Sequence, residues 1–221
     1  MRSQLLFKQK GITLIELLVA LVICAMVIGG IYRVFIAQSK AYTVQDQVIE
    51  VQQTVRSAME ILLRDLRMAG YDDDNIASTI TINTPIVYPV MDSSITVSYE
   101  YYDTTTLQYQ RHTVAYWRDA PSSTLFRQLT VNDVAGGLWE ILLENVDALN
   151  FTYGVDQNED GAMDDQNWMS AANVGIMKVV AVRMTLTGRP EKLDAQDDRF
   201  KMVTPRTLIS AVTLRNLCFS K

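Results

Sequence analysis

The chain has few of the residues that build catalytic and transition-metal sites, since its 221 residues include two cysteines and one histidine. Cys24 lies in an apolar N-terminal stretch and Cys218 lies close to the C-terminus, so the sequence predicts no disulfide between them. His112 has no second histidine and no cysteine pair beside it with which to hold a metal or activate a nucleophile. We therefore predict that the protein is not an enzyme and that His112 is a surface or half-buried strand residue.

Clusters of basic residues are also lacking. The chain has 20 lysines and arginines against 25 aspartates and glutamates, a formal net charge of -5, and three of the basic residues, Arg2, Lys8 and Lys10, lie within the first eleven positions. An acidic body without a basic stripe is poorly suited to a phosphate backbone, which argues against nucleic acid as a main partner. The sequence shows no repeats and no low-complexity tracts.

What the chain does have is a long apolar stretch. From Ile12 to Ile31 the polar side chains are those of Thr13 and Glu16. About 20 helical residues span ~30 Å, the thickness of the hydrocarbon layer of a bilayer. By the positive-inside rule the basic flank stays in the cytoplasm, so the rest of the chain is predicted on the far side, which in a bacterium is the periplasm. No small-x-small cleavage site follows the stretch, so we expect the anchor to be retained rather than removed as a secretory signal.

Glu16 is the exceptional residue of this stretch. An acid in the hydrocarbon costs ~2.5 to 3.5 kcal/mol on insertion scales and usually marks a paired or functional position. Two interpretations are open: Glu16 has a specific partner, or the segment is an ordinary single-pass anchor in which Glu16 reaches back to the cytoplasmic headgroups.

The residues around Glu16 resemble a known signal. The segment KGITLIELLVAL, residues 10–21, closely resembles the class III signal of type IV pilins and type II secretion pseudopilins. The resemblance implies that a prepilin peptidase cuts after Gly11 and that the new amine of Ile12 is methylated, although Phe or Met is commoner at that position. It also implies that Thr13 and Glu16 serve assembly, with the amine of a neighbouring subunit as the partner of Glu16.

A second apolar pattern follows the membrane segment. Apolar residues step by four and three through Val44, Val48, Val51, Val55, Ala58, Leu62, Leu66 and Ala69, the mark of a helix with one buried stripe. Since no proline lies between Ile12 and Gly70, we expect one helix that ends at Gly70 as its C-cap. We expect bending or local melting at Gly29 and Gly30, or close helix packing there in the membrane.

After residue 74 the pattern changes to short alternating runs bounded by turn residues. The predicted strands are 95–101, 107–117, 125–131, 146–153, 178–186 and 208–214, the first two joined by a turn at 103–106, and 188–199 is expected to be an exposed loop. Strands grouped after one long helix predict an α+β fold, in which a long N-terminal transmembrane and amphipathic helix packs on a mostly antiparallel sheet. The expected organisation is a cleaved leader at 1–11, a transmembrane half-helix at 12–31, an amphipathic periplasmic half-helix at 32–70 and a β-rich domain at 71–221.

Later segments narrow the resemblance. RDLRMAGY at 64–71 looks like the helix end of PilW-type minor pilins, and VTLRNL at 212–217 looks like the final strand of that group and of J-type minor pseudopilins. Residues 144–146 and 151–156 are similar to a mid-domain stretch of the same proteins. This resemblance implies a type IV pilin fold and a structural minor pilin that helps to initiate or cap a type IV pilus.

Two other functions stay open at this stage. One is a minor pseudopilin of a type II secretion system; the other is an adhesin module displayed at a filament tip through aromatic residues such as Tyr101, Tyr102, Tyr109 and Trp168. The resemblance implies other major and minor pilin-like subunits, prepilin peptidase, the inner-membrane assembly platform and membrane lipid as partners. It places the protein in the bacterial inner membrane, with the C-terminal domain in the periplasm, before it enters a filament.

One acidic loop has the order of a calcium site. Oxygen donors alternate and are followed by a glycine in DQNEDGAMDD at 156–165, which matches EF-hand positions 1, 3, 5, 6 and 9. We predict calcium as a cofactor, bound weakly by the side chains of Asp156, Asn158, Asp160 and Asp164 and by the carbonyl of Ala162. The twelfth position is Asn167 instead of glutamate, and a solvated acidic turn is the alternative.

Overall fold

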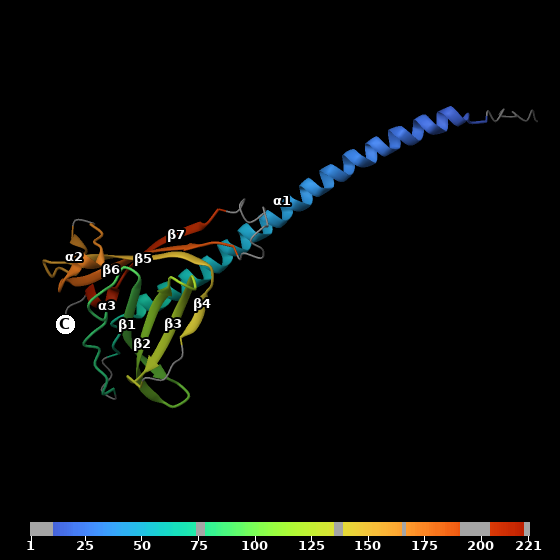
Figure 1. Ribbon diagram of the computed structural model, residues 1–221. Helices are drawn as coiled ribbons and strands as arrows, with labels where there is room; N and C mark the ends of the chain where they lie inside the picture. Colours follow the sequence, from blue (N-terminus) through green and yellow to red (C-terminus); the bar gives the residue numbers. More distant parts are fainter. Residues whose placement is uncertain (1–10, 74–77, 135–138, 165–166, 191–203, 219–221) are drawn as a thin grey trace, which may run out of the picture. The chain divides into compact units, whose positions relative to one another are not determined.

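The computed structural model describes residues 11–73, 78–134, 139–164, 167–190 and 204–218 (Figure 1). The chain divides into two compact units, Met1–Asp46 and Gln47–Lys221. The long helix α1, Leu14–Met68, begins in the first unit and ends in the second.

The first unit contains the N-terminal part of α1. By length and composition this helix is able to cross a membrane, and it is the one such helix in the described part of the chain. Large apolar side chains are exposed along the whole length of this part of the helix, among them Leu17, Ile23 and Phe35. A helix that is apolar on every side and uncovered by protein needs lipid or other helices around it.

The expected melting at Gly29 and Gly30 is wrong, because α1 is helical through both residues. Each glycine costs about 1 kcal/mol relative to alanine in a helix. A backbone group left unpaired in hydrocarbon costs several kcal/mol, so continuing the helix is the cheaper arrangement in a bilayer.

The second unit contains two antiparallel sheets rather than the single sheet that the sequence predicted (Figure 1). The first has the order β1-β2-β3-β4, with strands at Ser94–Asp103, Gln108–Asp119, Thr124–Val131 and Glu140–Leu143. The second has the order β5-β6-β7, with strands at Val146–Asp156, Lys178–Gly188 and Arg206–Thr213.

The six predicted strands are confirmed. The strand β4 and the short helices α2, Ala171–Val174, and α3, Arg215–Cys218, were not predicted. Each of these has four residues, which is too short for periodicity to detect. The described part of the predicted 188–199 loop ends at Pro190, and the rest lies outside the described residues.

The amphipathic stripe of α1 is confirmed from Val51 onward. Its apolar residues are buried and form one core with side chains of both sheets: Val51, Val55, Ala58, Leu62 and Leu66 pack with Val97, Val114, Phe151, Val182 and Leu186. The helix end is also as predicted, since Gly70 has a φ of 73° and its N–H donates a hydrogen bond of 2.9 Å to the carbonyl of Ser98. The domain is therefore built around the C-terminal part of α1.

A buried polar contact joins α1 to the first sheet. Asp65, which is only 2% exposed, accepts hydrogen bonds from the hydroxyl of Tyr116 at 2.6 Å and from Nε of Arg127 at 3.0 Å. Arg127 also pairs with Asp65 through its other guanidinium nitrogen at 3.0 Å. The position of one helix turn relative to β2 and β3 is thereby defined by directional bonds as well as by packing.

Candidate functional site

The start of α1 carries the predicted assembly residues, Thr13 and Glu16, and they contact each other. Oε2 of Glu16 accepts hydrogen bonds from the backbone N–H of Thr13 at 2.9 Å and from its hydroxyl at 2.8 Å, and Oγ1 of Thr13 accepts one from the N–H of Glu16 at 3.4 Å. This reciprocal arrangement is a capping box, which satisfies backbone donors that the first helical turn leaves unpaired. The Thr-x-x-Glu spacing before an apolar run is the sequence signal for such a box.

Oε1 of Glu16 takes no part in this box, and no cationic group of the described residues contacts the carboxylate. The neighbouring side chains of Leu14, Ile15 and Leu17 are apolar and exposed. The helix start therefore has a hydrogen-bonded anion in an apolar belt, with one oxygen open to a donor from another molecule.

Gly11 and Ile12, the predicted processing residues, precede the helix without regular structure. The side chain of Ile12 is 78% exposed, and among the described residues no atom beyond the adjacent residue lies within 4 Å of the position that a Cβ of Gly11 would take. The peptide bond between them is accessible. The predicted leader otherwise lies at residues 1–10, outside the described residues.

The predicted calcium ligands lie in one tight loop after β5. The carboxylate of Asp156 accepts hydrogen bonds from the N–H groups of Asp160 and Gly161, and the side chain of Asn158 accepts a second one from Asp160. The carboxylate of Asp160 accepts one from the N–H of Ala162, and that of Asp164 accepts one from the N–H of Gln157.

The loop thus binds its own amides, and the described residues contain no group of three or more acidic, histidine or cysteine side chains placed to share a metal ion. Asp165, the last residue of the predicted loop, lies outside the described residues. Calcium binding stays a prediction for this loop.

His112 is more buried than expected. It lies on β2 at 9% exposure, and its ring stacks on Tyr101 at 4.6 Å between centroids. Burial lowers its pKa, and the nearby Arg127 lowers it further. His112 is therefore a packed residue of the sheet, and among the described residues the hydrogen-bond partner of its Nε2 is Oε1 of Gln110 at 3.5 Å.

The aromatic residues named for an adhesin are unevenly exposed. Tyr101 and Tyr102 are exposed, whereas Trp168 is partly covered by Arg183, whose guanidinium lies 4.1 Å from the ring centroid. A second aromatic group is not visible in the sequence, because strand pairing brings its members together. Trp117 stacks on Phe126 across the β2–β3 register and contacts Trp139, and the two tryptophans are 41% and 40% exposed.

Comparisons with known proteins match both the N-terminal helix and the sheet domain. A family model for the prokaryotic N-terminal methylation motif matches residues 6–32, which include the capping box. A family model for the type IV pilus-assembly protein W matches residues 116–212, from the end of β2 to β7. Among solved structures, a type IV-like pilin from Thermus thermophilus aligns with a TM-score of 0.46 at 10% identity, over 75% of this chain and 97% of that one. No curated protein gives a significant match.

Proposed function

This chain is a type IV pilin-like protein of the PilW type, and from that premise we propose that it is a structural minor pilin that helps to initiate or cap assembly of a type IV pilus. The observation that supports the proposal most directly is the helix start. There the carboxylate of Glu16, hydrogen-bonded to Thr13 but without a cationic partner among the described residues, lies on an exposed apolar helix.

Processing is the first step of the proposal. A prepilin peptidase hydrolyses the peptide bond between Gly11 and Ile12, which gives the carboxylate of Gly11 on the leader and a free α-amine on Ile12. The accessible, non-helical backbone at this bond suits a peptidase, which needs an extended substrate. Methylation of the amine keeps its positive charge.

Pairing of Glu16 is the second step. In the separate subunit the two hydrogen bonds from Thr13 reduce the cost of placing the carboxylate in lipid. In a helix bundle the Ile12 amine of a neighbouring subunit donates to Oε1, which the capping box leaves open. A buried carboxylate is favourable only with its partner in place, so the pair selects the correct stagger between helices.

The proposed location and partners follow from the anchor. The subunit is held in the bacterial inner membrane with its sheet domain in the periplasm. It meets prepilin peptidase, the inner-membrane assembly platform, membrane lipid and other major and minor pilin-like subunits before it enters the filament.

Mass spectrometry of the membrane-extracted protein tests processing. We expect a methylated Ile12 at the N-terminus, and recovery of intact Met1 from cells with active peptidase would contradict the proposal.

Glu16→Ala should leave processing and membrane insertion intact but reduce incorporation into filaments, whereas Glu16→Asp should retain part of that incorporation. Incorporation of Glu16→Ala at the wild-type level, scored by filament fractionation, would refute the pairing.

Deletion of the gene separates the candidate roles. Loss of filaments supports initiation or capping, and loss of protein secretion with intact pili supports a minor pseudopilin. The exposed tryptophans Trp117 and Trp139 are the observation that favours an adhesin. Normal filaments that no longer attach would support that role.

A further inference from the structure

The outer edge of β7 is an unpaired row of backbone donors and acceptors. β7 is the last strand of its sheet, and no other described segment bridges to it on the side away from β6. The comparable edges are covered, since Pro85 and Val87 hydrogen-bond along β1, and Asp92 and Met169 hydrogen-bond along β5. An open edge of eight residues is a template for a further strand, and proteins usually blunt such edges.

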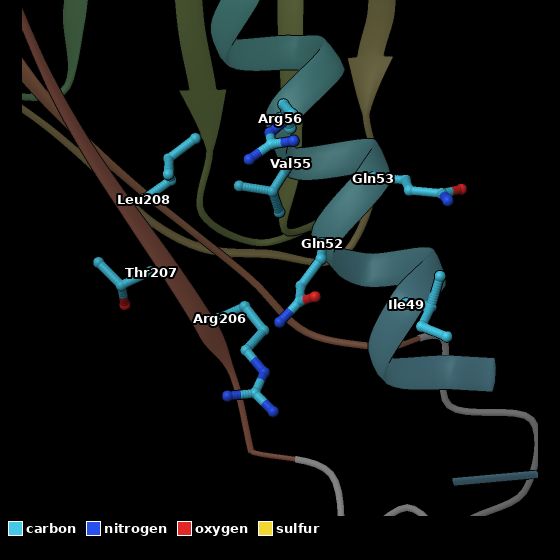
Figure 2. Close-up of a pocket in the computed structure, with 8 residues that line it drawn as sticks. All are labelled: Ile49, Gln52, Gln53, Val55, Arg56, Arg206, Thr207 and Leu208. Carbon is cyan, nitrogen blue, oxygen red and sulfur yellow. The ribbon is translucent and has the colours of Figure 1, made fainter. Parts of the chain in front are cut away.

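A groove runs beside this edge, between β7 and α1. It has a volume of about 510 Å³ and is lined by one face of the helix, from Ile49 to Arg56, and by Arg206, Thr207 and Leu208 of the strand. Figure 2 shows the side chain of Gln52 directed from the helix toward Arg206. A segment that lies in this groove has side-chain contacts from the helix and backbone partners from the strand.

The groove is basic. Arg56 is exposed on the helix and Arg206 stands at the first position of β7, and neither forms an ion pair within the described residues. Nε of Arg206 is buried and has no hydrogen-bond acceptor in the described part of the chain. None of the lining residues is acidic, although the whole chain has a net charge of -5. A buried guanidinium nitrogen without an acceptor calls for one from outside, and a carboxylate suits the planar fork of arginine.

We propose that this groove binds an extended acidic segment of another pilin-like subunit, which adds a strand to β7 and places a carboxylate against Arg56 and Arg206. This inference rests on the proposed function, because it requires that the chain meets other subunits in a filament. The two arginines by themselves would also accept a phosphate. A phosphate-bearing lipid, however, would leave the backbone groups of β7 unpaired, whereas an extended peptide satisfies both the strand edge and the arginines.

Site-specific photo-crosslinking of the full-length chain in cells that assemble filaments tests the inference. Benzoylphenylalanine is placed at Thr207, which lines the groove, and in a matched control at Thr105, an exposed turn residue outside it. We expect position 207 to crosslink to an acidic peptide in the sheet domain of another pilin-like subunit, and position 105 not to do so. A crosslink from 207 to residues 191–203 of the same chain, to lipid, or to a peptide without an acidic side chain would overturn the proposal.

Charge reversal gives the second test. Arg206→Glu, and independently the exposed Arg56→Glu, should lower the crosslink at position 207 about ten-fold, the size of a lost charge-assisted hydrogen bond. Arg67→Glu makes the same charge change at an exposed position of the same helix and should leave the crosslink unchanged. Replacing the acid of the crosslinked partner peptide with lysine should restore the crosslink in the Arg56→Glu background. An unchanged crosslink in both reversal variants would contradict the arginine contact.

Co-isolation with other pilin-like subunits is measured in the same cells. Co-isolation without a crosslink at position 207 contradicts binding of another subunit in this groove but does not contradict the proposed function. Failure to co-isolate removes the proposed function, and this inference with it.

Discussion

The residue with the clearest energetic role in the sheet domain is Asp65. It was not predicted, because an aspartate on a helix surface normally faces solvent, and the pattern of apolar residues says nothing of a polar one among them. In the structure it is buried and accepts hydrogen bonds from Tyr116 and Arg127, which come from strands far away in sequence. Burial and the bond to Asp65 raise the pKa of Tyr116, so its hydroxyl stays protonated and donates.

Removal of the Asp65 carboxylate is therefore expected to destabilise the domain strongly. Asp65→Ala should cost about 3 to 5 kcal/mol, because it leaves the Arg127 guanidinium without its buried partner. Chemical denaturation of the full chain in detergent measures the loss. The control is Arg64→Ala, whose side chain is 69% exposed and 3.6 Å from Asp65, and which should change stability by less than about 1 kcal/mol. Equal effects of the two variants would show that the buried contact contributes no more to the free energy of unfolding than the exposed one.

His112 makes the stability of the domain sensitive to acid. Its folded-state pKa is lowered, first by burial and then by Arg127, against smaller opposing effects of Asp103 and Asp65. The unfolded chain therefore binds a proton at a higher pH than the folded one, so stability falls as the pH drops through the ordinary histidine pKa toward the lowered one.

His112→Gln removes this titration. The variant should lose less stability than the wild type between pH 7 and about pH 5, while carboxylate titrations affect both proteins alike. Melting curves of the two full-length proteins over this pH range provide the measurement. Parallel pH profiles would contradict the assignment.

At the scale of elements, α1 and the second sheet approach each other closely at Gly188. A Cβ on this residue would lie 2.6 Å from Cγ2 of Val55, a buried residue of the core. Gly188→Ala should therefore destabilise the domain by about 1 to 3 kcal/mol through overpacking. The double variant Gly188→Ala with Val55→Ala should recover part of the lost stability, and Thr185→Ala on the same strand should have little effect. Thermal unfolding of the full chain tests this, and the absence of any recovery would show that steric contact with Val55 is not the cause.

Also at this scale, the two sheets differ in how their edges are protected. β1 and β5 have loops hydrogen-bonded along their outer edges, and β4 has only four residues. β7 alone among the described edge strands is both long and uncovered, which is why the proposed partner segment is assigned to it.

For the molecule as a whole, the acidic loop packs against α3, the last described helix. Gly161 has a φ of 81° and lies directly against the backbone carbonyl of Cys218 in α3, with no room for a Cβ. An ion bound by the loop would therefore stabilise the packing of α3 as well as the loop itself.

We expect calcium to raise the melting temperature of the full-length protein. At ten times the dissociation constant the stabilisation is about 1.4 kcal/mol, which corresponds to a shift of a few degrees. The shift should vanish in Asp156→Ala and Asp160→Ala, and magnesium should produce less of it because it tolerates irregular sites poorly. Calorimetric titration to several millimolar calcium without heat or melting shift would favour the solvated turn.

The sequence by itself determined the features that depend on local spacing. An apolar run of membrane length, an amphipathic stripe without proline, a glycine at the helix end and alternating strand residues each follow from neighbours within a few positions, so the long helix, its end at Gly70 and six strands were predicted correctly. The processing and assembly residues Gly11, Ile12, Thr13 and Glu16 were named from the resemblance of residues 10–21 to the class III signal, and their roles stay predictions.

The tertiary structure decided everything that depends on pairing across the chain. The division into two sheets, the burial of Asp65 and His112, and the exposed stack of Trp117 on Phe126 arise from strand register between distant segments. The groove between β7 and α1 likewise combines a helix face and a strand about 150 residues apart in sequence. No local pattern encodes such contacts, because they are selected by the packing of the whole core, in which each side chain must fit neighbours that the rest of the chain places there.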